Sequence, residues 1–81
     1  MQNLTVFFIF TPWRQSHKWE VGEDGLVDYN GSRISPREAY QRFQIDYPMF
    51  EINRAEVCER IDSPDGPRDY TWISLERFDR D

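Results

Sequence analysis

The most hydrophobic stretch of the chain is LTVFFIF, residues 4–10. A strand points successive side chains to opposite faces of a sheet. One face of this segment would carry Leu4, Val6, Phe8 and Phe10, and the other Thr5, Phe7 and Ile9. Two apolar faces are typical of a strand that is covered on both sides. The pattern therefore predicts a central strand, and it raises the question of what covers the second face.

The clearest helix signal lies in ISPREAYQRFQIDYP, residues 34–48. Ser35 suits the N-cap, Pro36 the first helical position, and Glu38 the capping box. Pro48 disfavours helical geometry in the residue before it, so the helix should span about residues 36–46. Its apolar stripe consists of Ala39, Tyr40 and Phe43.

Shorter alternating stretches predict two hairpins. Residues 17–21 and 26–29 flank the turn sequence GEDG, which predicts a hairpin over residues 16–30. Residues 55–62 and 70–78 flank PDGPR, which predicts a second hairpin. In the last strand, alternation would place Tyr70, Trp72, Ser74 and Phe78 on one face. Residues 49–55 fit a loop, a helical turn or the start of a strand.

These elements predict a single α+β domain over residues 1–81. We expect an antiparallel sheet of four to five strands with a single α-helix packed on one face, in the order β-ββ-α-ββ. An eleven-residue helix is roughly 16 Å long, so it cannot cover both faces of such a sheet. The second face could be covered by connecting segments with Trp13, Met49 and Phe50, by a second copy of the chain, or by another protein.

The charge of the chain is mildly acidic, because 15 Asp and Glu oppose 10 Lys and Arg, for a net charge of −5. This balance disfavours direct binding to nucleic acid, which depends on neutralising phosphates. The single cysteine, Cys58, excludes an intramolecular disulfide. The first 15 residues lack signal-peptide features, and the apolar run is too short to span a bilayer. We therefore predict a cytoplasmic protein without membrane association.

Candidate catalytic chemistry is sparse. Cys58 has no neighbouring base in the sequence, and His17 has no second His or Cys that could join it around a metal. The spacing EVGEDGLVD does not match an EF-hand. We expect no cofactor, no metal and no enzymatic activity. Arg68 beside Tyr70 and Trp72 is compatible with an RNA-binding sheet, although the RNP motif is missing.

These observations favour a non-enzymatic, small, acidic protein-binding module that inhibits or modulates a larger partner. Interface anchors are usually aromatic, so the predicted anchors are Trp13, Trp19, Tyr70 and Trp72. Acidic side chains that could steer the chain toward a basic partner are Glu20, Glu23, Asp24 and Asp28. The alternatives are a homodimeric structural or accessory protein, and further a small enzyme or an RNA-binding sheet protein.

In size, acidity and lack of motifs, the chain resembles the accessory inhibitors made by bacteriophages and mobile elements, such as anti-CRISPR proteins and inhibitors of host RNA polymerase. This resemblance rests on size and composition, and it carries over no individual residue. It implies a role in host–virus interaction. It also implies a protein partner that itself binds nucleic acid, whose basic groove the acidic hairpin would occupy in competition with phosphate.

Overall fold

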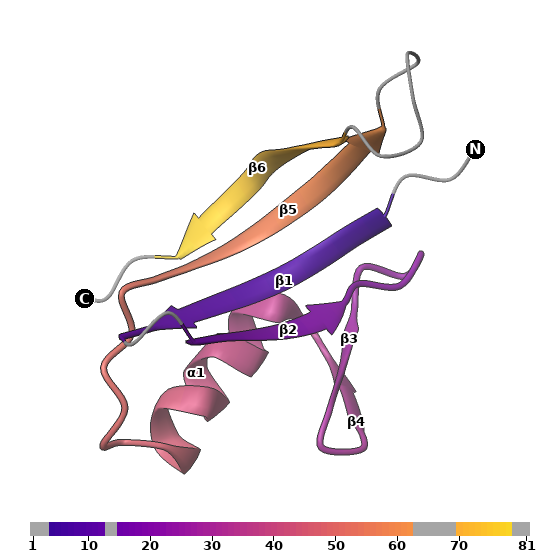
Figure 1. Ribbon diagram of the computed structural model, residues 1–81. Helices are drawn as coiled ribbons and strands as arrows, with labels where there is room; N and C mark the ends of the chain where they lie inside the picture. Colours follow the sequence, from indigo (N-terminus) through magenta and orange to yellow (C-terminus); the bar gives the residue numbers. More distant parts are fainter. Residues whose placement is uncertain (1–3, 13–14, 63–69, 79–81) are drawn as a thin grey trace.

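The computed structural model of the protein describes residues 4–12, 15–62 and 70–78. Its elements are β1 (Leu4–Thr11), β2 (Gln15–Glu20), β3 (Val27–Tyr29), β4 (Ser32–Ile34), α1 (Pro36–Asp46), β5 (Arg54–Asp62) and β6 (Tyr70–Phe78). Four strands form an antiparallel sheet in the order β2-β1-β5-β6, and β3 and β4 form a separate small sheet (Figure 1). The predicted α+β class and the order of the elements are confirmed.

The central position predicted for the first strand is also confirmed, because β1 lies between β2 and β5. Phe7 is opposite Trp19 on β2 and opposite Val57 on β5. Successive residues of β1 bond to opposite neighbours. The N–H of Val21 donates to Thr5 O at 2.9 Å on the β2 side, and the N–H of Asn53 donates to Phe10 O at 2.8 Å on the β5 side.

Helix α1 begins and ends where the sequence predicts. The Ser35 hydroxyl accepts a hydrogen bond from the N–H of Glu38 at 3.2 Å, which caps the first turn. The Glu38 carboxylate forms an ion pair with Arg42 at 3.5 Å, one turn along the helix. At the other end, the N–H of Tyr47 donates to Phe43 O, directly before Pro48. Both ends are therefore defined by local sequence.

The hairpin predicted over residues 16–30 is wrong. β2 pairs with β1 instead, with Trp19 opposite Phe7. β3 pairs with β4 across the turn at Asn30 and Gly31, whose φ values of 51° and 86° suit a type I′ turn. The two turn signals are real, but the pairing differs because the apolar positions of β2 continue the apolar face of β1 across the sheet.

The second hairpin, formed by β5 and β6, is confirmed but contains a register shift between Val57 and Cys58. Cys58 is opposite Ser74, whereas Val57 is opposite Glu76, so Leu75 is an extra residue. A bulge of this kind reverses the faces of the residues that follow it. Phe78 therefore lies on the helix side, and not on the face of Tyr70 and Trp72 as strict alternation predicts.

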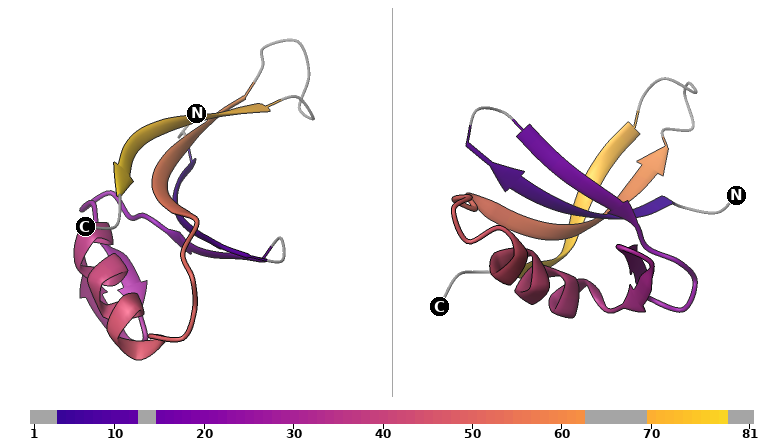
Figure 2. Two further views of the ribbon diagram at one scale, coloured as in Figure 1. Left: turned by 90° about the vertical axis from the view of Figure 1, so that its left-hand side faces the viewer. Right: turned by 90° about the horizontal axis from the view of Figure 1, so that it is seen from below.

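The hydrophobic core lies between the large sheet and a layer formed by α1 and the β3–β4 sheet. Figure 2 shows both elements of this layer on the same side of the large sheet. The Tyr29 hydroxyl donates a 2.7 Å hydrogen bond to Asp46, which ties β3 to the end of the helix. The buried core residues are Phe7, Ile9, Val27, Tyr29, Ile34, Ala39, Tyr40, Phe43, Ala55, Val57 and Phe78.

The segment after the helix, which the sequence left open, is a loop up to Asn53, and β5 begins at Arg54. The ring of Phe50 in this loop lies 5.4 Å from the ring of Tyr47 and 6.4 Å from that of Phe43. The loop therefore packs on the helix side and does not cover the second face of β1. Among the described residues, no helix has the length and hydrophobicity that crossing a membrane requires.

Candidate functional site

The face of the large sheet that points away from α1 is the candidate site, and we call it the open face. Its apolar side chains come from the even positions of β1 and from the first half of β6. Register places the following residues on this face: Leu4, Val6, Phe8, Phe10, Ser16, Lys18, Glu20, Arg54, Glu56, Cys58, Arg60, Asp62, Tyr70, Trp72, Ser74 and Arg77.

A groove of about 590 Å³ crosses the open face, and all four strands contribute to its lining. Lys18 and Glu20 form the wall on β2, and Tyr70 and Trp72 form the wall on β6. Arg60 contributes from β5, and the remaining lining residues are Leu4, Val6 and Phe8 of β1. A groove with aromatic, aliphatic and a few charged groups is suited to binding a side chain or a short peptide segment.

A band of stacked rings runs along the open face. The guanidinium carbon of Arg54 lies 4.5 Å from the ring centre of Phe10, and the rings of Phe10 and Phe8 stack at 5.5 Å. Phe8 meets Trp72 edge-on at 5.1 Å, and Trp72 meets Tyr70 edge-on at 6.2 Å. These contacts link β5, β1 and β6, and they hold the exposed rings in defined positions.

A second arginine is placed at the far end of this band. The Arg60 guanidinium lies 5.3 Å from the ring centre of Tyr70, and its Nε lies 3.2 Å from a carboxylate oxygen of Asp62. By contrast, the side chains of Lys18 and Glu20 form no hydrogen bond or ion pair with any described residue, although both line the groove. The rim on β2 is therefore the part of the groove whose charges are open to a ligand.

The predicted aromatic anchors that the structure describes do not all lie on one face. Tyr70 and Trp72 lie on the open face, with 53% and 38% of their surface exposed. Trp19 lies on the helix side, where its ring stacks on Phe7 at 5.5 Å and meets Phe43 at 6.2 Å, so it belongs to the packing of the core. Trp13 lies outside the described residues.

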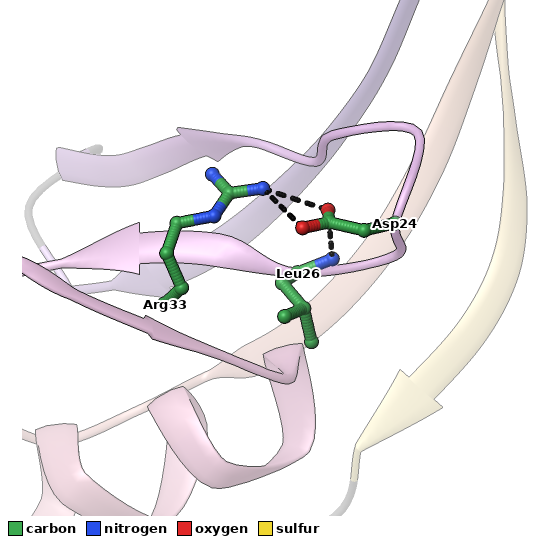
Figure 3. A network of polar contacts seen from close by, with 3 residues as sticks. All are labelled: Asp24, Leu26 and Arg33. Carbon is green, nitrogen blue, oxygen red and sulfur yellow. Dashed lines mark hydrogen bonds and ion pairs between the residues drawn. The ribbon is translucent and has the colours of Figure 1, made fainter.

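The predicted acidic side chains divide between the groove and the adjoining turns. Glu20 lines the groove, and Glu23 is exposed in the turn that follows it. Asp24 accepts 2.7 Å hydrogen bonds from Arg33 on both carboxylate oxygens and a 3.1 Å bond from the N–H of Leu26 (Figure 3).

The bond from Arg33, followed by the one from the Leu26 N–H, holds the pKa of Asp24 below its ordinary value. Asp28 accepts a 3.1 Å hydrogen bond from the N–H of Gly31 in the β3–β4 turn. Asp24 therefore stabilises the turn before β3, and Asp28 stabilises the turn between β3 and β4, while both add negative charge.

Sequence reasoning assigned no site role to five groups that line the groove, namely Leu4, Val6, Phe8, Lys18 and Arg60. Alternation along β1 places Val6 and Phe8 on one face. The pairing of β2 with β1, which the sequence did not predict, is needed to bring Lys18 opposite Phe8. The strongest signal for the groove was therefore the two-sided hydrophobicity of β1.

The two candidate nucleophilic or basic residues are separated by the sheet. Cys58 is opposite Val6 on the open face, whereas the His17 ring packs 5.1 Å from the ring of Phe43 on the helix side. Burial, followed by the nearby Glu56 carboxylate, raises the pKa of the Cys58 thiol, which disfavours the reactive thiolate. Cys58 and His17 therefore cannot act together as a thiol–imidazole pair.

No group of three His, Cys, Asp or Glu side chains in the described part of the chain is arranged to hold a metal ion. Comparison of the chain with protein-family models, with curated proteins and with solved structures finds no match. The functional argument consequently rests on the chemistry and geometry of the open face.

Proposed function

We propose that the chain is a non-enzymatic protein-binding module that inhibits or modulates a larger protein. The observation that carries the proposal is the groove on the open face, because none of the described connecting segments covers it. An apolar groove flanked by exposed aromatic rings and by charged groups is characteristic of an interaction surface. The proposed contact residues are Phe8, Lys18, Glu20, Tyr70 and Trp72.

Within this surface, Trp72 and Phe8 supply the anchors. Their rings are held edge-on at 5.1 Å, so little side-chain entropy is lost when a partner packs against them. Val6 and Cys58 beneath them are only 7% and 5% exposed, so the floor of the groove is already well packed. A partner would therefore complete a layer over a preformed surface.

The acidic turn next to the groove supports a partner with a basic surface. Glu20 forms the end of β2, and Glu23, Asp24 and Asp28 follow within eight residues without an intervening basic residue. Clustered like charges raise the rate of association with an oppositely charged surface. Proteins that bind nucleic acid carry such surfaces, so they form the partner class that we propose.

Site-specific photo-crosslinking tests the location of the surface. A photoreactive phenylalanine analogue placed at Trp72 should capture a defined partner in cells of the source organism. The matched control carries the same analogue at Ile45, which is 75% exposed on α1, away from the groove. An identical set of adducts from both positions, or none from Trp72, would contradict the proposal.

Affinity measurements with the purified partner then test the anchors. Because truncation of a central aromatic anchor commonly costs about 2 kcal/mol or more, Trp72→Ala should weaken binding by about 30-fold or more. Ile45→Ala serves as the control and should leave affinity unchanged. Circular dichroism confirms that each variant is folded. Equal affinities for the two variants would remove the open face from the interface.

Charge reversal separates steering from anchoring. Lysine at Glu20 and Glu23 should lower the association rate at low salt and flatten its dependence on ionic strength. Glu51→Lys, in the exposed loop before β5, produces one such charge change away from the groove and is the control. If the association rates of all these variants remain equal to that of the unmodified chain, the steering role is wrong.

Single-stranded RNA is a second candidate ligand, favoured by one observation. The described open face carries four basic and three acidic side chains, and Arg54 and Arg60 flank its ring band, although the whole chain is acidic. Rings and guanidinium groups on a sheet can stack unpaired bases. Fluorescence anisotropy with a labelled oligonucleotide, using Trp72→Ala as the variant, distinguishes this ligand from a protein partner.

A further inference from the structure

The two edges of the large sheet differ in their chemistry. β2 is short and carries Lys18 and Glu20, and charged side chains are a common protection of an edge strand. β6 is the other edge, and its first six residues, YTWISL, contain no charge, proline or glycine. An uncharged edge rich in aromatic and β-branched residues favours pairing with a further strand.

The first half of β6 is also uncovered on the helix side. Ile73 is 44% exposed and Leu75 is 55% exposed, and Ile61 on the neighbouring strand is 39% exposed. Helix α1 contacts the C-terminal end of β6, where Arg37 pairs with Glu76 at 3.2 Å and the ring of Tyr40 stacks on Phe78 at 5.7 Å, whereas Ile73 and Leu75 stay exposed. β6 therefore presents an apolar surface together with an unpaired backbone edge.

The hydrogen-bond directions of β6 follow from those of β1. Thr5 bonds toward β2 and Phe10 toward β5, and N–H and C=O groups of successive strand residues point to opposite sides. Continuing this alternation through β5 directs the backbone of Thr71 and Ile73 toward β5. The backbone groups of Tyr70, Trp72 and Ser74 then point outward, where no described strand receives them.

We propose that β6 pairs in antiparallel orientation with β6 of a second copy, about a two-fold axis at Ile73. In this register, Trp72 exchanges backbone hydrogen bonds with the partner's Ser74, and Ile73 is opposite the partner's Ile73. The extra residue of the bulge, Leu75, comes close to the partner's Thr71. No charged side chain lies between Thr71 and Leu75, so the contact is self-complementary without repulsion.

The product would be a continuous eight-stranded sheet in the order β2-β1-β5-β6-β6-β5-β1-β2. Such pairing buries Ile73 and Leu75 of both copies and joins the two open faces across the axis. Trp72 points into the groove while its backbone faces the edge, so the dimer and a partner in the groove are compatible. The inference does not depend on the proposed function.

Sedimentation velocity over a wide range of protein concentrations tests the dimer. The unmodified chain should shift from monomer to dimer as concentration rises. Ser74→Pro removes an outward N–H without touching the bonds to β5, so it should abolish the shift, whereas Ser74→Ala should retain it. A chain that remains monomeric at its highest soluble concentration would overturn the proposal.

A second variant keeps the test decisive if the proline variant fails to fold. Ile73→Lys places two like charges opposite each other at the axis, and it should raise the dimer dissociation constant by about tenfold or more. Ile45→Lys on α1 adds the same charge away from the edge and should leave dimerisation unchanged. An unchanged dissociation constant for Ile73→Lys would exclude the β6 edge.

Cysteine crosslinking tests the register in a Cys58→Ala background. Directly opposed residues that do not share hydrogen bonds have Cα atoms about 4.5 Å apart, which a disulfide can bridge. Ile73→Cys should therefore form a covalent dimer on mild oxidation, and Lys18→Cys on the other edge should not. Crosslinking through Trp72→Cys but not Ile73→Cys would contradict the register, and crosslinking through Lys18→Cys alone would contradict the edge.

Discussion

The two faces of β1 carry similar side chains in different surroundings. Phe7 and Ile9 on the helix side are fully buried, whereas Phe8 and Phe10 on the open face are half-buried. On the helix side, the rings of Trp19 on β2 and Phe78 on β6 pack against Phe7. On the open face, Phe8 is in contact with Phe10 and with Trp72 at the edge of the sheet.

This difference shows that the hydrophobicity of a strand does not determine how completely it is buried. How far a face of β1 is buried depends on which other elements pack against it. Helix α1 together with β3 and β4 forms one such layer, on the helix side. Arginine and aromatic side chains on the open face shield part of its apolar surface while leaving rings accessible. The helix side therefore serves stability, and the open face leaves apolar rings exposed, which is the basis of the proposed binding.

Truncating one ring on each face should give the largest contrast. Phe7→Ala leaves a cavity in a closed core, so it should lower the free energy of unfolding by about 3–5 kcal/mol. Phe8→Ala removes a ring that is already half-exposed, and it should cost about 1 kcal/mol. Urea denaturation of both variants measures this difference. Equal losses would mean that the open face is as tightly packed as the core.

The hydrogen bond between Tyr29 and Asp46 tests how firmly the covering layer is held together. Tyr29→Phe removes a bond to a charged acceptor that joins β3 to α1, and it should cost about 1–2 kcal/mol. Thermal or urea denaturation at neutral pH measures this loss. Tyr47→Phe, at a more exposed ring, is the control.

The same bond gives a pH dependence. Burial, followed by the Asp46 carboxylate, raises the pKa of Tyr29, so the folded chain retains a proton that the unfolded chain loses above about pH 10. Stability should therefore fall as pH rises beyond this point. Tyr29→Phe should reduce the slope of that fall, and an unchanged slope would assign it to other groups.

Cys58 tests whether the floor of the open face is closed. Because burial raises the pKa of its thiol, alkylation by iodoacetamide near pH 8 should be slow. A Lys18→Cys variant that also carries Cys58→Ala provides an exposed thiol on the same face, which should react faster. Similar rates would show that the rings above Cys58 open readily.

The raised pKa of Cys58 also predicts a loss of stability at alkaline pH. The folded chain keeps the thiol proton while the unfolded chain loses it above about pH 8.5, so stability should decline as pH rises from there. Cys58→Ala should remove this part of the decline. Urea denaturation at several pH values provides the measurement.

The smallest effect is expected at the exposed turn between β2 and β3. Asp24→Asn weakens the ion pair with Arg33 and should speed amide hydrogen exchange at Leu26, with little change in global stability. The pKa of Asp24 is held low in the folded chain, so its contribution is present at neutral pH and is lost as pH falls below its ordinary value near 3.8. A large global destabilisation would show that the turn supports the covering layer.

Local sequence predicted several elements correctly because their signals act over a few residues. Ser35, Pro36 and Pro48 determined both ends of α1, and Asn30 with Gly31 determined a tight turn through two positive φ angles. The alternation of β1 identified a two-sided strand, and with it the aliphatic and aromatic floor of the candidate site. These predictions needed no knowledge of which strands are neighbours.

Neighbour relations were less predictable from sequence. The same alternation in residues 17–21 is compatible with pairing to β1 or to β3, and the structure selects β1. The bulge at Leu75 is invisible to a strict period of two, so the face of Phe78 was predicted wrongly. Both errors concern which segments pair and in which register. Burial of the whole core determines that pairing.

The amino-acid sequence alone determined the helix, its caps, the turns and the two apolar faces of β1, because each depends on interactions within a few residues. The tertiary structure decided that Trp19 packs in the core while Trp72 faces the open groove, and that Lys18 lies opposite Phe8. Strand order and the position of one extra residue set those outcomes. They depend on how all the apolar side chains of the chain pack under a single covering layer. No short stretch of sequence contains that information.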